Sequence, residues 1–211
     1  MVLFADLNEQ DFNQIHTPID DLVYGADAVL YHEGAKALGV FTLRKGLVKL
    51  VRSTADGRER IVRVLRPGDV AGLEALATAH YDTEAVAMVD TQVCRIPLAV
   101  MHHLSAHSPR LHLRLMQKWQ QALKDADDWL AELNFGSARQ RVVGLALKMR
   151  DSEQPSMTQL FARDDMGAML DLKLETVSRE ISALVRDGLI RPMDKSGRRY
   201  EILNEQRLQA L

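Results

Sequence analysis

Three side chains that can hydrogen-bond to DNA bases fall close together on one predicted helix. Glu175, Ser178 and Arg179 are spaced so that they share one face of an α-helix. Arginine can donate two hydrogen bonds to guanine, glutamate can accept one from cytosine, and serine can bond to a base edge or a phosphate. The spacing therefore predicts a base-reading surface. A simpler alternative is an i,i+4 ion pair between Glu175 and Arg179, which stabilises a helix by only about 0.2–0.5 kcal/mol.

A helix-turn-helix is the arrangement that positions such a surface. Arg163–Leu170 is predicted to form a short helix, Asp171–Lys173 interrupts the helical period, and Leu174–Asp187 resumes it. In a helix-turn-helix, the N-terminal half of the second helix lies in the major groove and reads the bases. We therefore expect Leu174–Asp187 to be a recognition helix.

Two short runs after this helix predict a β-hairpin, or wing. Leu189–Arg191 and Arg199–Leu203 flank a segment that contains glycine and proline. Cations in such a wing contact phosphates, which position a protein on DNA without reading its sequence. The residues expected to contact phosphates are Lys173, Thr176, Lys195, Arg198 and Arg199.

A long amphipathic helix is predicted from Pro109 onward. Its apolar residues follow spacings of three and four over about six turns, which is typical of a helix-helix seam. A second apolar stripe at Met116, Leu123 and Leu130 lies beside the first, so one stripe can cover the chain's own domain and the other a partner chain. The residues predicted to form a dimer interface are Leu115, Trp119, Ala122, Ala126, Trp129 and Leu133. The alternative is one wide stripe buried inside a monomer.

The chain before this helix has the pattern of an all-β domain. From Asp21 to about Pro97, short runs rich in β-branched residues alternate with turn residues. Asp56-Gly57 is a hairpin signal, because a two-residue type I′ turn requires positive φ. The predicted strands are Ala28–Tyr31, Gly39–Leu43, Leu47–Arg52, Arg60–Leu65, Thr83–Val89 and Thr91–Ile96. After the long helix, Ser137–Arg150 predicts another helix and Asp151–Thr158 a loop.

Composition excludes several classes of protein. The 211 residues are 46% hydrophobic, which is incompatible with disorder. One cysteine excludes an internal disulfide and a multi-thiolate metal site, and no stretch resembles a secretory signal or approaches about 18 apolar residues. We therefore expect a cytoplasmic protein with no membrane contact. The net charge is −2, but residues 135–211 carry 13 Lys and Arg against 11 Asp and Glu, whereas residues 1–134 carry 14 against 18.

Taken together, these segments resemble the CRP/FNR family of bacterial transcription regulators. The residues that carry the resemblance are Leu43–Leu50, Arg66–Leu76, the long helix after Pro109, and Leu174–Arg179. The last segment is similar to the E-x-x-S-R element of the FNR branch, which implies a palindromic site with TTGAT-type halves. The resemblance also implies a homodimer and RNA polymerase as a further partner.

The resemblance implies an α+β fold in three parts. These are an N-terminal double-stranded β-helix or jelly-roll sensor domain (residues 1–108), a long dimerisation helix (109–135) and a C-terminal winged helix-turn-helix (136–211). In the family, the sensor domain receives a signal that the long helix relays to the DNA-binding domain.

The effector of this chain is unknown from its sequence. Cyclic-nucleotide-binding members carry a phosphate cassette, G-E-(L/I/V)-(A/G)-L followed by R-(S/T)-A, and the matching residues here are Gly72–Leu76 and Thr83–Ala85. The cationic Arg is missing and the carboxylate of Glu84 lies beside its position, which disfavours cyclic AMP. Cys94 stands alone, so an FNR-type iron–sulfur cluster is not expected.

Other functions stay open as alternatives. One is a regulator of this family that does depend on a cyclic nucleotide, and another is a regulator without a small-molecule effector. A haem bound by one of the seven histidines is a further alternative, although His102, His103, His107 and His112 match no ligand motif and we predict no metal site. An enzyme with a cupin-like metal site would need several histidines near His32, which the sequence lacks, so we predict no catalytic residues.

Overall fold

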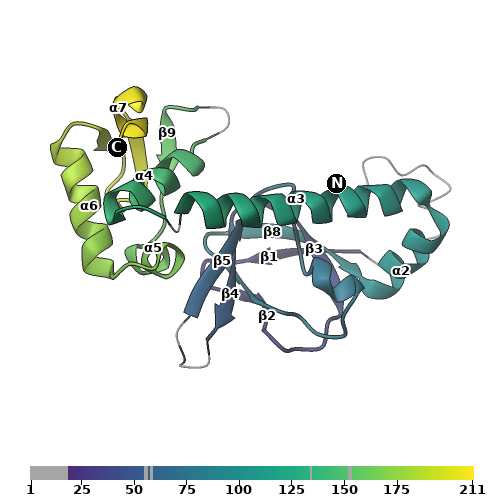
Figure 1. Ribbon diagram of the computed structural model, residues 1–211. Coiled ribbons are helices and arrows are strands. Elements are labelled where there is room, and N and C mark those ends of the chain that lie inside the picture. Colours follow the sequence, from purple (N-terminus) through teal and green to yellow (C-terminus); the bar gives the residue numbers. More distant parts are fainter. Residues whose placement is uncertain (1–18, 55–56, 58, 134, 152–153) are drawn as a thin grey trace. The chain divides into compact units, whose positions relative to one another are not determined.

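The N-terminal part of the chain forms two antiparallel sheets that face each other (Figure 1). The computed structural model describes residues 19–54, 57, 59–133, 135–151 and 154–211. One sheet has the strand order β1-β8-β3-β6 and the other β2-β7-β4-β5, so strands distant in sequence are neighbours. The strands are β1 (Asp20–Tyr24), β2 (Val29–Tyr31), β3 (Gly39–Lys45), β4 (Val48–Ser53), β5 (Glu59–Leu65), β6 (Val70–Ala71), β7 (Glu84–Ala87) and β8 (Thr91–Pro97).

The core of this β-roll lies between its two sheets. Phe41 and Leu43 of β3 and Val48 and Leu50 of β4 are buried in one apolar cluster, because alternate residues of a strand point to the same face. The predicted hairpin is confirmed: β4 and β5 pair antiparallel from Val48↔Leu65 to Ser53↔Glu59. Asp56 of the predicted turn lies outside the described residues. Strands β1 and β6 are not among the strands predicted from the sequence.

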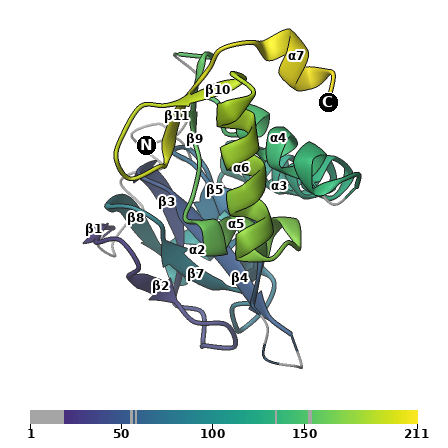
Figure 2. The same cartoon turned by 90° about the vertical axis from the view of Figure 1, so that its left-hand side faces the viewer.

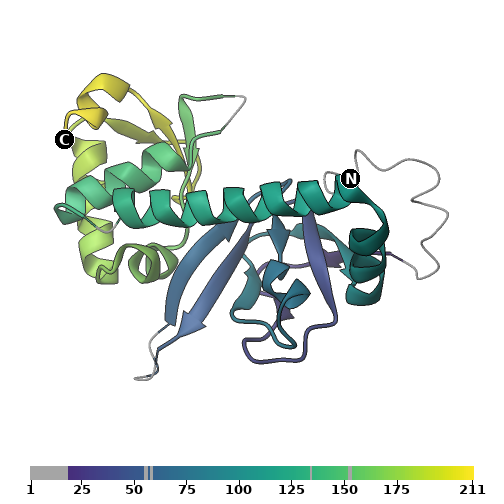
Figure 3. The ribbon, with the colours of Figure 1, turned by 45° about the vertical axis from the view of Figure 1, so that its right-hand side comes forward.

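Two α-helices follow the roll and meet at a sharp corner (Figure 3). Helix α2 (Leu98–His107) is not predicted from the sequence, whereas α3 (Pro109–Leu133) confirms the predicted long helix with 25 residues. Val100 and Met101 of α2 and Leu111 and Leu115 of α3 share a buried cluster with strand residues of the roll. A short 3₁₀ helix, η1 (Leu73–Leu76), lies between β6 and β7 in the chain.

The chain divides into two compact units between Ala126 and Asp127, within α3. The second unit contains α4 (Ala138–Lys148), β9 (Met157–Gln159), α5 (Arg163–Leu170), α6 (Leu174–Arg186), β10 (Ile190–Pro192), β11 (Arg199–Ile202) and α7 (Glu205–Gln209). Strands β10 and β11 confirm the predicted hairpin, and β9 pairs with β11 to complete a three-stranded sheet. The loop predicted over Asp151–Thr158 is wrong at its end, because Met157 and Thr158 belong to β9.

Local chemistry explains where the helices of the second unit begin and end. Ser137 caps α4 in a capping box, in which its hydroxyl accepts from Gln140 N and the Gln140 side chain accepts from Ser137 N. Between α5 and α6, Asp171 adopts the left-handed conformation with φ of 54° and ends α5. Gly167 lets the turn approach α5, because a Cβ there would lie 2.7 Å from the Leu172 carbonyl oxygen.

Candidate nucleic-acid interface and β-roll interior

Helix α6 packs beside α5 in the second unit (Figure 2). One of its faces is buried, and the residues predicted to read bases lie on the other. Val177, Ile181 and Leu184 are buried at spacings of four and three, and α6 packs against α4 and α5. On the other face, Glu175 and Arg179 are exposed and Ser178 is half-buried. The three residues therefore share the N-terminal half of one helix, as their spacing predicts.

The alternative ion pair between Arg179 and Glu175 is not among the ion pairs of the described residues. Arg179 Nε lies 3.6 Å from Glu180 Oε1 instead, and the Arg179 side chain is 71% exposed. A pair at this distance and exposure contributes little to stability, so the guanidinium can leave it for a stronger partner. Because the neighbour is Glu180, the carboxylate of Glu175 is available for a separate contact.

The residues predicted to contact phosphates belong to α6 and its N-terminal flank and to the wing. Lys173 is exposed immediately before α6, and the backbone N–H of Thr176 donates to its carbonyl at 2.9 Å. In the wing, the Asp194 carboxylate accepts from the backbone N–H groups of Arg198 and Arg199, both at 3.2 Å. Desolvation raises the pKa of Asp194, but these two hydrogen bonds and one from the Ser196 side chain outweigh it, so the pKa is lowered. Lys195, Arg198 and Arg199 are all exposed.

Arg163 anchors the wing, a role that its sequence position does not reveal. Its guanidinium donates to Tyr200 Oη at 2.7 Å and to the Gly197 carbonyl at 3.2 Å, which joins the start of α5 to the wing turn and to β11. These partners are more than 30 residues away in sequence, at separations of 34 and 37. No periodic or motif signal could have identified this contact.

Arg141 makes a second connection that sequence reasoning missed. Its Nη1 donates to the Leu170 carbonyl at 2.8 Å and its Nε to the Gly136 carbonyl at 3.3 Å. Leu170 is the last residue of α5, and Gly136 precedes α4 with φ of +86°. Arg141 therefore links the segment before α4 to the turn that orients α6.

Helix α3 carries an exposed apolar stripe, but it is not the stripe predicted to contact a partner. Leu115 and Leu133 are buried in the chain's own cores, and Ala122, Ala126 and Trp129 are half-buried. Both apolar stripes have the helical period, so the sequence could not tell which one the roll covers. The exposed apolar residues of α3 are Leu113, Met116, Trp119, Leu123 and Leu130.

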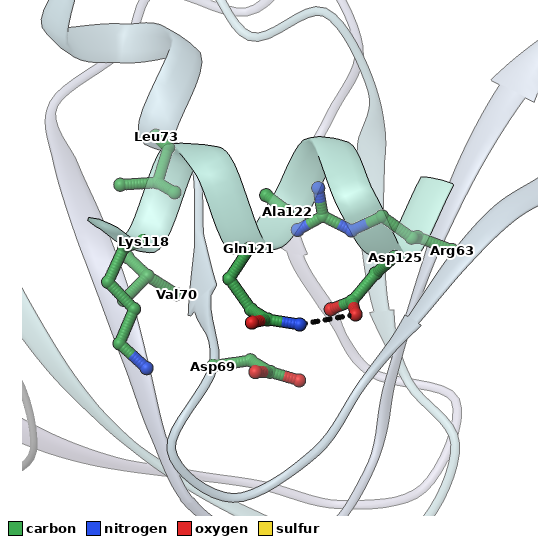
Figure 4. Close-up of a pocket in the computed structure, with 8 residues that line it drawn as sticks. All are labelled: Arg63, Asp69, Val70, Leu73, Lys118, Gln121, Ala122 and Asp125. Atoms are coloured by element: carbon green, nitrogen blue, oxygen red, sulfur yellow. Dashed lines mark hydrogen bonds between the residues drawn. The ribbon is translucent and has the colours of Figure 1, made fainter. Parts of the chain in front are cut away.

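A polar depression lies between the roll and α3 within the first unit (Figure 4). Lys118 Nζ donates to the Gly68 carbonyl at 2.7 Å, and Gln121 Nε2 donates to Asp125 Oδ1 at 2.8 Å. The first bond fixes one face of α3 on the turn before β6, which leaves the apolar stripe on the open side. The depression is lined by Arg63, Asp69, Val70, Leu73, Lys118, Gln121, Ala122 and Asp125.

Two tyrosines stack inside the roll. The rings of Tyr31 and Tyr81 are 3.9 Å apart and inclined by 17°. Tyr81 Oη donates to the Gly39 carbonyl at 2.7 Å, and its ring packs on Gly72, where a Cβ would be 2.9 Å from Tyr81 Cε1. Gly72 is the first residue of the stretch that matches the phosphate cassette, so a bulky side chain occupies the space above it.

The roll contains a half-buried carboxyl group at Glu74. Glu84 Oε2 lies 2.5 Å from Nδ1 of the exposed His32, so the carboxylate beside the position of the missing Arg has a partner at the surface. Burial raises the pKa of Glu74, although the backbone N–H groups of Glu74 and Asp82 donate to it. Among the described residues, no hydrogen bond of good geometry reaches Glu74 Oε1, Tyr31 Oη or Thr83 Oγ1, although the Thr83 side chain lies close enough to Tyr31 to lower its pKa.

Comparison with known proteins supports both units. A family model described as "Cyclic nucleotide-binding domain" matches residues 22–108, and one described as "Crp-like helix-turn-helix domain" matches residues 140–211. The transcriptional activator protein FnrL of Cereibacter sphaeroides is 30% identical over 86% of this chain and 75% of its own length. The chain belongs to the CRP/FNR family of transcription regulators.

Further members of the family agree in sequence and in fold. The transcriptional activator protein anr of Pseudomonas aeruginosa is 28% identical over 86% of this chain and 76% of its own length. The structure of FixK2 from Bradyrhizobium japonicum has a TM-score of 0.82 at 28% identity and covers 92% of this chain and 98% of FixK2. The α+β fold class, with a jelly-roll-like roll and a C-terminal helix-turn-helix, is thereby confirmed, as is the function of a DNA-binding transcription regulator.

The residues of the roll do not fit the cyclic nucleotide that the first family model implies. Thr83 stands where the cassette pattern has its Arg, Tyr81 covers Gly72, and the carboxyl group of Glu74, within the matching stretch, is half-buried. An anionic phosphodiester needs a charge-assisted partner in such a site. An iron–sulfur cluster does not fit either, because the 211 residues contain one thiol, that of the buried Cys94.

Two further findings concern the described residues alone. No helix among them has the length and apolarity required to cross a membrane. Within the same part of the chain, no three histidine, cysteine, aspartate or glutamate side chains are grouped so that they could hold a metal ion.

Proposed function

We propose that this regulator reads a palindromic site with TTGAT-type halves through Glu175, Ser178 and Arg179. The observation that supports the proposal is the two-faced character of α6, whose inner residues are buried while Glu175 and Arg179 are exposed and Ser178 is half-buried on the other face. Arg179 bonds to guanine and Glu175 accepts from cytosine, while Lys173, Thr176 and the wing cations hold the phosphates.

The test compares two arginines of the same helix. Arg179→Ala is expected to reduce the preference for a TTGAT palindrome over a random duplex by about 1–3 kcal/mol per half-site, measured by fluorescence anisotropy at one fixed salt concentration. Arg186→Ala is the matched control, because Arg186 is 78% exposed at the other end of α6. If the Arg179 variant selects the palindrome as well as the parent does, the assignment of the reading face is wrong.

We further propose that the chain binds this palindrome as a homodimer through the exposed stripe of α3. Leu113, Met116, Leu123 and Leu130 remain uncovered on a helix whose other face contacts the roll. A second copy of α3 would remove these side chains from water and place two recognition helices on one palindrome. Trp119 lies at the edge of the exposed stripe and belongs both to the interface predicted from the sequence and to the interface proposed here.

Sedimentation velocity tests this interface with two leucines of equal exposure. Leu123→Glu is expected to shift the protein to the monomer, because a charge would be buried without a partner. Leu38→Glu is the control, since Leu38 is also 65% exposed but lies on the roll. A dimer of unchanged stability in the Leu123 variant would contradict the proposed interface.

We propose that DNA binding does not depend on a cyclic nucleotide. The Tyr31–Tyr81 stack, the partial burial of Glu74 and the absence of the cassette Arg all support this. Titration calorimetry with cyclic AMP and cyclic GMP should therefore give no saturable heat. Saturable binding in the micromolar range would contradict the proposal.

We propose RNA polymerase as a further partner of the chain. We also propose that the chain acts without catalysis. Relatives named as transcriptional activators support a contact with polymerase, which transcription in vitro from a promoter that carries the palindrome would detect. His32, on which a cupin-like alternative depended, pairs with Glu84 at the surface of the roll. Among the described residues, no group of side chains favours an enzymatic function.

A further inference from the structure

We propose that His103 and His107 of α2 form a surface site for one divalent transition-metal ion. The two residues are four positions apart on a helix, so they share one face. Both are exposed, and their rings are 4.5 Å apart and inclined by 31°. This inference does not depend on the proposed function.

The fold sets one of the two rings in the protonation state that a metal requires. His107 Nδ1 lies 2.7 Å from the His103 carbonyl oxygen. A carbonyl oxygen can only accept, so Nδ1 carries the proton and the lone pair of His107 is on Nε2. Histidines that bind metals typically donate their other ring nitrogen to a carbonyl or carboxylate in this manner, because the bond fixes the tautomer and the ring orientation.

The chemistry of the pair selects the class of ion. Imidazole suits Zn²⁺, Ni²⁺ and Cu²⁺, whereas Mg²⁺ and Ca²⁺ prefer oxygen ligands. Two histidines at i and i+4 on one helix face are also the pair that binds zinc in helical metal motifs. Because the described residues offer no group of three ligands, water completes the coordination and the ion exchanges readily.

The site lies at the end of α2, next to the corner that leads into α3. Ser108 is buried at this corner, and its hydroxyl accepts from Leu111 N at 3.4 Å. An ion that bridges the last two turns of α2 would stiffen the segment before α3, while Val100 and Met101 hold the first half of α2 in the core. The sequence alone does not reveal this pair, because α2 is not predicted as a helix and the histidines match no known ligand motif.

Equilibrium dialysis of the full chain against Zn²⁺, followed by elemental analysis, tests the site. The protein should carry no affinity tag and should first be stripped with a chelator. We expect one Zn²⁺ per chain in the parent, a loss of that ion in both His103→Gln and His107→Gln, and no retention of Mg²⁺. His80→Gln is the matched control, because His80 is exposed on another part of the roll.

A second measurement separates metal binding from a structural role of the two rings. Zn²⁺ should raise the thermal midpoint of the parent and of the His80 variant, but not that of the His103 or His107 variants, whose midpoints without metal should equal the parent's. No bound Zn²⁺ in the parent, or full retention in either α2 variant, would overturn the proposal.

Discussion

Tyr81→Phe removes one oxygen atom from the interior of the roll and leaves the stacked ring in place. That oxygen donates to the Gly39 carbonyl at 2.7 Å and lies 3.3 Å from the backbone nitrogens of Leu38 and Gly39. The buried carbonyl loses this donor, and an unsatisfied buried group costs about 1–3 kcal/mol. The two amide contacts are long, so most of the effect comes from the carbonyl. We expect the free energy of unfolding of the roll to fall by about 2 kcal/mol, the middle of that range.

Tyr31→Phe deletes the same atom from the other ring of the stack, with the opposite expectation. Tyr31 Oη is buried and makes no hydrogen bond of good geometry with the described residues. Burial and the nearby Glu74 charge raise the pKa of Tyr31, and the neighbouring Thr83 side chain lowers it in part. A hydroxyl that gives up water without gaining a partner opposes folding. This variant should therefore be as stable as the parent or more stable.

Urea unfolding followed by circular dichroism measures both variants. The measurement should be repeated at several protein concentrations, because dissociation of a dimer makes apparent stability depend on concentration. A loss of stability for Tyr31→Phe as large as that for Tyr81→Phe would show that the Tyr31 hydroxyl is bonded. The description of the roll interior would then be wrong, and so would the expectation built on it.

Three further variants test other local features. Gly167→Ala places a Cβ 2.7 Å from the Leu172 carbonyl oxygen, so we expect a loss of about 1–3 kcal/mol in unfolding free energy and weaker operator binding in an anisotropy assay. Ser137→Ala removes the capping box of α4 and should cost about 1 kcal/mol by urea unfolding, whereas Ser182→Ala on the exposed side of α6 should cost little. Glu74→Gln tests a pH dependence. Burial raises the pKa of Glu74 in the folded state above its ordinary value of 4.5. The favourable contribution of this carboxyl group to the free energy of unfolding is therefore complete below pH 4.5 and is lost as the pH rises through the folded pKa. The variant should be more stable than the parent at neutral pH, and a parent-like pH profile of unfolding would contradict this.

The DNA-binding unit could be predicted well because its signals are local. The bounds predicted for Arg163–Leu170 match α5, and α6 ends one residue before the predicted end at Asp187. Both helices have a strong period, and Gly188 follows the second one. Strand β9 was missed because it is three residues long and depends on pairing with β11, about 40 residues further on in the chain.

The roll was harder to predict because its decisive contacts join distant residues. Strand β1 has the sequence DDLVY, and its first residue pairs with Arg95, which is 75 positions away. The residue pattern of β7 does not indicate that Glu84 contacts His32, which is 52 positions away. The sequence around Glu74 likewise does not indicate that its carboxyl group is half-buried. On α3, two stripes had the same period, and only contacts such as that of Lys118 with Gly68 decide which one faces the roll.

The specificity of α6 depends on how easily Arg179 leaves Glu180. A surface ion pair is worth about 0–1 kcal/mol, whereas a bidentate contact with guanine discriminates by about 1–3 kcal/mol. The exchange therefore favours DNA even if the whole ion pair is lost. Glu180 is only 17% exposed and remains next to Arg179. At a DNA site without a guanine in reach, the guanidinium is more stable in the ion pair with Glu180, so Glu180 weakens binding to such sites. Glu180→Gln should accordingly strengthen binding to random DNA more than binding to the palindrome, and an equal change on both duplexes would refute this role.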